Sequence, residues 1–223
     1  SPPADYYLNV LIPLLGRMGY DVQMDLLSRG FYPQGGGAVR ASIAPCLGLM
    51  ALDLGERGRL VEVGGECFTQ NLPEHVAHRM EDAVRQSLVD HELRLRTRRT
   101  TGHSTGAGTA LYARYQNTVL GADGLGKKGV PAERVGEEAA ARLRQEMDGP
   151  GTLDVHAADQ LLPYMALAGG PSAFRVREVT EHLTTQMWLL RQFLDVEFVM
   201  ERDRRGARVE VMPTRTSREG RPA

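Results

Sequence analysis

The sequence has few of the features that mark secreted or membrane proteins. Its 223 residues include only two cysteines, Cys46 and Cys67, which provide neither a disulfide framework nor a metal-ligand spacing. No apolar run approaches the length needed to cross a bilayer, and no charged, then apolar, then small-residue leader opens the chain. These absences predict a cytoplasmic protein without membrane contact.

An excess of charge of one sign is also lacking. The formal net charge at pH 7 is −1, so no global positive field indicates a nucleic-acid-binding protein. With 42% hydrophobic and 25% charged residues, the composition is typical of a soluble globular protein. Any contact with a polyanion is therefore expected to be local.

Three consecutive glycines occur in the segment RGFYPQGGGAV, residues 29–39. Strand-like patterns precede and follow it, at residues 22–27 and 38–45. Because glycine loses the most backbone freedom on folding, such a run marks a tight turn or a close approach to the backbone. The residues alone favour a glycine-rich hairpin turn over a ligand-binding loop.

The remaining chain alternates helical and strand-like patterns, which predicts an α/β protein with helices covering sheets. Helices are expected at 7–18, from Pro73, at 131–147, 155–168 and 181–194, and strands at 49–54, 59–65, 93–100, 109–116, 173–179, 196–200 and 207–212. The basic, polar tail after Pro213 is expected to be disordered.

The segment LRLRTRRT, residues 93–100, alternates leucine with arginine. This pattern predicts a half-buried strand with a basic outer face. Edge strands use such charge against aggregation, although the same arginines could also contact phosphates. The structural interpretation is favoured, because neither net charge nor aromatic content supports nucleic-acid binding.

Two predicted helices begin with polar residues. HAADQ, residues 156–160, opens an otherwise apolar helix, and its polar members His156, Asp159 and Gln160 can share one helical edge. His182 lies in the first turn of the next helix, where the helix end favours anions and phosphate groups. A histidine there is suited to attack a phosphate or to lie beside one, but a histidine without a catalytic role is the open alternative.

Several segments together resemble the RNA 3′-terminal phosphate cyclase family. RGFYPQGGGAV looks like the family signature, ADQLLPYMALA resembles its nucleotide-pocket helix, and EHLTTQMWLL resembles the segment with its nucleophilic histidine. LGADGLGKKGVPAERVGEEAA and the opening PPADYYLNVLIPLL are also similar to family stretches. The resemblance runs in order from residue 1 to about residue 200.

The resemblance implies an ATP-dependent, ligase-class reaction in RNA processing. A histidine attacks the α-phosphate of ATP and forms a covalent histidine–AMP. The AMP passes to an RNA 3′-phosphate, and the adjacent 2′-hydroxyl then closes a 2′,3′-cyclic phosphate. The implied catalytic residue is His182, and the implied nucleotide-binding residues are His156, Ala157, Ala158, Asp159, Gln160, Pro2 and Tyr6. His156 would stack on adenine where many members have tyrosine.

The family fold implies repeated β-α-β-α-β-β units forming a cyclase core, with a smaller inserted α/β domain of thioredoxin-like topology. The core would comprise residues 1–58 and 148–223, and the inserted domain residues 59–147. Relative to the family, an amino-terminal third is missing from this sequence, together with the carboxylate for a divalent metal (Mg or Mn) and the arginines that grip the RNA phosphate. The chain alone is therefore expected to be impaired, unless another chain supplies that segment.

Two other interpretations remain open. One is a catalytically inactive, cyclase-like RNA-binding or ribosome-assembly protein, against which the presence of His182 argues. The other is a homo-oligomer that associates through exposed strand edges.

Overall fold

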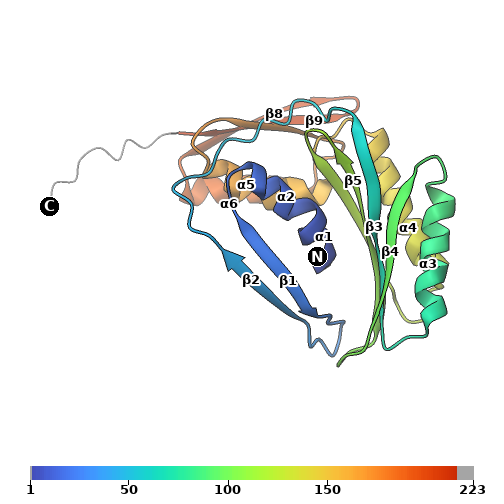
Figure 1. Ribbon diagram of the computed structural model, residues 1–223. Coiled ribbons are helices and arrows are strands. Elements are labelled where there is room, and N and C mark those ends of the chain that lie inside the picture. Colours follow the sequence, from blue (N-terminus) through green and yellow to red (C-terminus); the bar gives the residue numbers. More distant parts are fainter. Residues whose placement is uncertain (1, 215–223) are drawn as a thin grey trace.

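The computed structural model describes residues 2–214, which form helices and three β-sheets (Figure 1). This arrangement confirms the predicted α/β class. The helices are α1 (Ala4–Tyr6), the π-helical stretch η1 (Tyr7–Leu11), α2 (Ile12–Arg17), α3 (Glu74–Ser87), α4 (Ala132–Asp148), α5 (Val155–Ala166) and α6 (Glu181–Phe193). The strands are β1 (Val22–Ser28), β2 (Ala38–Ile43), β3 (Leu60–Gln70), β4 (Leu93–Thr100), β5 (Gly106–Tyr115), β6 (Val119–Leu125), β7 (Ser172–Val176), β8 (Val196–Asp203) and β9 (Gly206–Pro213).

The strands β1 and β2 form a two-stranded antiparallel ribbon on either side of the glycine segment. The hairpin predicted from the sequence is therefore confirmed. Gly35 and Gly36 have φ angles of 70° and 81°, a region that L side chains rarely adopt. A Cβ at Gly30 would lie 2.3 Å from the backbone nitrogen of Gly37, so the two arms of the loop touch through their backbones.

The four-stranded sheet has the order β4-β3-β5-β6. β3 and β4 are parallel, and the other neighbours are antiparallel. The amphipathic helices α3 and α4 cover one face, as Figure 1 shows. β4 lies at the edge and its exposure alternates along the strand, as the leucine and arginine pattern predicts.

The three-stranded sheet has the order β7-β9-β8 and packs with α5 and α6. The strand predicted at 49–54 is wrong, because this segment forms only isolated bridges, from Leu49 to Ala168 and from Asp53 to Ala173. The amide of Leu52 donates to the side-chain oxygen of Ser172. The Ser172 hydroxyl therefore accepts the hydrogen bond that, in a regular β-ladder, the Leu52 amide would donate to a backbone carbonyl.

Buried apolar side chains gather in two clusters. One joins the N-terminal helices to α5, α6 and the three-stranded sheet, and the other lies between the four-stranded sheet and the helices α3 and α4. The proposed core and insertion boundaries at residues 59 and 147 stay a prediction, as does the thioredoxin-like assignment. The tail beyond Thr214, expected to be disordered, lies outside the described residues.

Candidate functional site

The buried carboxylate of Asp154 organises the start of α5. Its Oδ1 accepts bonds from the amides of His156 and Ala157, each at 3.0 Å, and from the Tyr6 hydroxyl at 2.7 Å. Its Oδ2 accepts the amide of Gly121 in β6 at 2.8 Å. Burial raises the pKa of Asp154, and these hydrogen bonds oppose the rise. One side chain thus links the N-terminal helix, β6 and the helix that carries His156.

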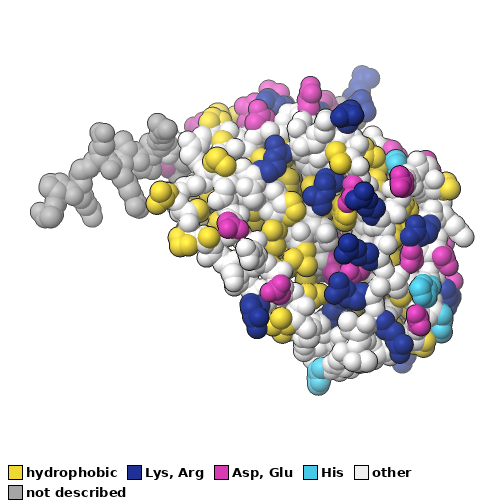
Figure 2. Space-filling model, viewed as in Figure 1, with side chains coloured by type: hydrophobic (Ala, Val, Ile, Leu, Met, Phe, Trp, Pro, Cys, Tyr) yellow, Lys and Arg dark blue, Asp and Glu magenta, His cyan; other side chains and the backbone are white. Residues whose placement is uncertain are grey.

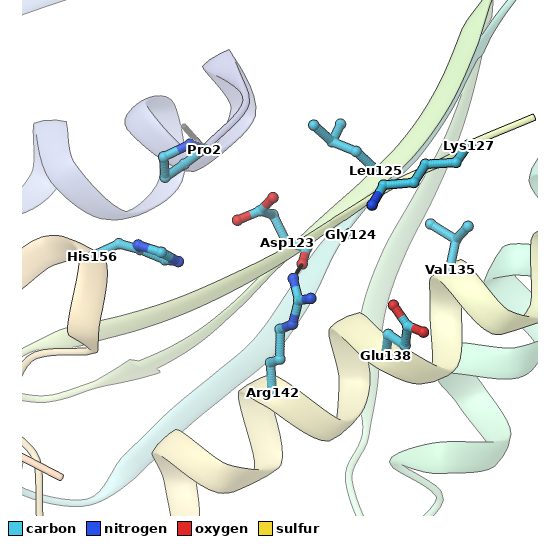
Figure 3. Close-up of a pocket in the computed structure, with 9 residues that line it drawn as sticks. All are labelled: Pro2, Asp123, Gly124, Leu125, Lys127, Val135, Glu138, Arg142 and His156. Carbon is cyan, nitrogen blue, oxygen red and sulfur yellow. Dashed lines mark hydrogen bonds between the residues drawn. The ribbon is translucent and has the colours of Figure 1, made fainter. Parts of the chain in front are cut away.

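A cleft of about 280 Å³ lies between α5, β6 and α4 (Figure 3). Its lining residues are Pro2, Asp123, Gly124, Leu125, Lys127, Val135, Glu138, Arg142 and His156. In Figure 3, Pro2 and His156 face Asp123 from one side, while Arg142 reaches the Asp123 carbonyl from α4, at 2.9 Å. Two of the predicted nucleotide contacts, Pro2 and His156, therefore meet in one cavity.

The sequence predicted no role for the four charged residues that complete this cleft, Asp123, Lys127, Glu138 and Arg142. Burial raises the pKa of Asp123, and the nearby His156 and Arg142 oppose that shift. The available signal was the segment LGADGLGKKG, which resembles a family stretch and contains Asp123 and Lys127. Arg142 lies on the following helix, and only the fold brings it to the same cavity.

Three of the predicted nucleotide contacts are buried instead of lining the cleft. Tyr6 is 1% exposed, Ala157 is 0% and Ala158 is 1% exposed. The Tyr6 ring meets the His156 ring edge to face, with centroids 6.3 Å apart. In this geometry Tyr6 supports His156 from behind, and a direct contact between these three residues and a nucleotide stays a prediction.

Two polar side chains of α5 have unused hydrogen-bonding capacity. Oδ1 of Asp159 and Oε1 of Gln160 are buried and have no hydrogen-bond partner in the described part of the chain. Burial raises the pKa of Asp159, while the imidazoles of His156 and His182 lie close enough to oppose that shift. A buried polar atom without a partner is costly, so each of these oxygens still requires a donor, although neither Asp159 nor Gln160 lines the cleft.

His182 is exposed in the first turn of α6 and does not line the cleft. Thr180 caps this helix by accepting the amide of Leu183 at 3.2 Å. His182 and the cleft residue His156 are both close enough to Asp159 to oppose the rise that burial causes in the pKa of its carboxyl.

Between residues 2 and 214, no group of three or more His, Cys, Asp or Glu side chains is arranged to hold a metal ion. In the same part of the chain, no helix has the length and apolar character required to cross a membrane.

The fold and the site define an α/β protein with a polar cleft beside the first turn of a helix. The family model for RNA 3′-terminal phosphate cyclase matches residues 1–200, and the chain belongs to this family. Similar relatives, each bearing the name RNA 3′-terminal phosphate cyclase, come from Nitrosospira multiformis (39% identity), Methanococcoides burtonii (41%) and Methanopyrus kandleri (39%). The alignments cover 96%, 91% and 96% of this chain, but only 62%, 59% and 63% of the respective relatives. The chain thus spans about three-fifths of the length of these proteins.

Proposed function

We propose that this chain takes part in the ATP-dependent conversion of an RNA 3′-terminal phosphate into a 2′,3′-cyclic phosphate. Its membership of the cyclase family and the names of its relatives support this proposal. The reaction class would be that of a ligase acting as a nucleotidyl transferase on RNA ends. The chain covers only about three-fifths of the length of its relatives, so the activity that their names state is a proposal for this chain.

In the proposed reaction, an imidazole nitrogen of His182 attacks the α-phosphorus of ATP. A nitrogen–phosphorus bond forms, the bond to the bridging oxygen breaks, and pyrophosphate leaves. An oxygen of the RNA 3′-phosphate then displaces the histidine and accepts the AMP. Finally the 2′-hydroxyl loses its proton, attacks the 3′-phosphorus and expels AMP, which closes the cyclic phosphate.

The observation that carries the proposal is that two histidines from different helices both lie close enough to Asp159 to affect the pKa of its carboxyl. His156 belongs to the cleft, His182 lies on the next helix, and both imidazoles lie near the Asp159 carboxyl. We assign the adenine to His156 and Pro2, and the ribose hydroxyls to the unpartnered oxygens of Asp159 and Gln160. That placement would direct the phosphates of the nucleotide toward His182, as an in-line attack requires.

The resemblance also implies a divalent cation, which in such reactions neutralises developing charge on phosphate oxygens. The described residues do not supply a three-ligand set for it.

The test is a cyclisation assay with RNA labelled at its 5′ end and phosphorylated at its 3′ end. Protein in excess over RNA keeps a slow single turnover detectable. We expect an ATP-dependent product whose terminal phosphate resists phosphatase, lost in His182→Ala and retained in the control His78→Ala on α3. RNA binding without any cyclisation would instead favour the catalytically inactive, cyclase-like interpretation.

A further inference from the structure

Four arginines are exposed on the edge strand β4, and the proposed function does not use them. They are Arg94, Arg96, Arg98 and Arg99. Figure 2 shows Lys and Arg side chains gathered over the part of the molecule where β3 and β4 lie in Figure 1. The net charge of the chain is only −1, so this basic stripe is a local concentration of positive charge, which favours contact with an anionic partner.

The strand register places Arg94, Arg96 and Arg98 on the same sheet face as the cleft. Arg99 falls on the opposite face, with Thr97, whose hydroxyl donates a hydrogen bond to Glu81 of α3. Arg98 pairs with Phe68, Phe68 with Gly108, and Gly108 with Leu125, a residue that lines the cleft. The next row along the strands is Arg96, Glu66, Ala110 and Asp123. Paired residues project from one face, and α3 and α4 cover the opposite face. We call the face that carries these two rows the inner face.

A second cavity, of about 380 Å³, lies along the first of these rows. It is bordered by Phe68 and Leu125 from the sheet and by Phe31 and Tyr32 from the glycine loop, residues 29–37 between β1 and β2. Leu125 and Pro2 line both this cavity and the cleft, so the two adjoin. Tyr32 is 96% exposed, and an exposed aromatic ring is a platform on which a nucleobase can stack.

The arginines have donors available for a phosphate backbone. Arg98 pairs with Glu66 at 3.0 Å and Arg94 with Glu62 at 2.7 Å, but these guanidinium groups are 58% and 77% exposed. The carboxylates are only 13% and 18% exposed and stay in place, but a guanidinium group has five N–H donors, so each exposed arginine keeps donors for a phosphate oxygen. Arg96 has no acidic partner among residues 2–214.

We propose that the RNA strand runs from the cleft, over the second cavity, to Arg96 and Arg98 at the β4 edge of the inner face. Between these ends Gly108 and Phe68 are buried, so the strand passes above them, along the glycine loop. An apolar, aromatic cavity followed by arginines fits single-stranded nucleic acid, whose bases stack and whose phosphates need cations. Three strand spacings separate β6 from β4, or about 14 Å, so the RNA must extend beyond its terminal nucleotide to reach the stripe. This inference rests on the proposed function, since it takes the substrate to be RNA.

The test compares the affinities of fluorescent single-stranded RNAs of about two and about ten nucleotides, each with a 3′-phosphate, for the protein. The longer RNA is expected to bind more tightly to the wild type. The double variant Arg96→Ala/Arg98→Ala should lose affinity for it on the order of tenfold, with little change for the shorter one. The slope of log affinity against log salt should fall by about 1.4, the release expected for two phosphate contacts on a single strand.

Arg85→Ala on α3, which lies behind the sheet, serves as the matched control and should leave the affinity for the longer RNA unchanged. Equal affinities and salt slopes for the wild type and the double variant would overturn the inference, as would a wild type that binds neither RNA. Labelling of the wild type by ATP is measured separately. An arginine-dependent affinity without labelling would leave this inference standing and count against the proposed function.

Discussion

The hydroxyl oxygen of Tyr6 lies 2.7 Å from Oδ1 of Asp154, although 148 residues separate the two in the sequence. Both side chains are buried, and the same carboxyl oxygen also accepts the first amides of α5. This polar contact adds to the apolar cluster that packs the N-terminal helices against α5, the helix that bears His156.

Replacing Tyr6 with phenylalanine is expected to destabilise the protein by about 1–3 kcal/mol, because the buried Asp154 loses a donor while the ring volume is kept. Nucleotide affinity should fall as well, since the start of α5 loses an anchor. Urea unfolding and calorimetric ATP titration measure the two effects. The control is Tyr7→Phe, whose hydroxyl makes no hydrogen bond within the described residues, and a similar loss in both variants would contradict this role for Tyr6.

A second prediction concerns the close backbone contact between Gly30 and Gly37 in the glycine loop. In Gly30→Ala the new Cβ would lie 2.3 Å from the nitrogen of Gly37 and 2.8 Å from its Cα, and a backbone cannot move aside as a flexible side chain can. We expect a loss of about 2 kcal/mol or more in the free energy of unfolding. Gly48→Ala is the matched control, because a Cβ there meets nothing within 4 Å. Equal stabilities of the two variants would show that the close contact does not constrain the loop.

The pH dependence of stability should depend on Glu146. Burial raises the pKa of this residue from 4.5 to about 7, although Arg177 donates a hydrogen bond to its Oε1 at 2.9 Å. The other oxygen, Oε2, has no hydrogen-bond partner in the described structure. The folded state therefore binds the proton more tightly than the unfolded state. Protonated Glu146 therefore adds to the free energy of unfolding. This contribution is complete below pH 4.5 and is lost as the pH rises through about 7, and it amounts to at most about 3 kcal/mol.

The variant Glu146→Gln is expected to remove this part of the slope between pH 5 and pH 8, while its amide oxygen can still accept from Arg177. Chemical unfolding at a series of pH values measures the slope. Glu137→Gln, an exposed position on the same helix, should retain the wild-type dependence. A slope in Glu146→Gln as steep as in the wild type would refute the assignment.

Much of the fold could be predicted from local patterns, since α3, α4 and the β1–β2 hairpin follow from periodicity, proline and glycine. The strand β6 was missed because its segment VLGADGL has two glycines and an aspartate, which are poor strand formers. The structure explains them by close packing: a Cβ at Gly121 would lie 2.6 Å from Tyr6, and one at Gly124 would lie 2.7 Å from the carbonyl of Val135. Such non-local contacts leave no signal in a short window of sequence.

The same limit applies to the candidate site. Resemblance identified His156 and Pro2, which the structure brings to one cleft, but it could not show that Tyr6 is buried behind His156. Nor could it show that Arg142 reaches β6 from α4. The hydrogen bonds that fix these positions join residues far apart in the chain.

The central claim is that His182 becomes covalently bonded to AMP, and incubation with α-labelled ATP and a divalent metal tests it most directly. We expect label on the denatured wild-type protein that is released by acid, absent from His182→Ala and present in His78→Ala. Label retained by His182→Ala, or no label on a wild-type protein shown by titration to bind ATP, would contradict the account.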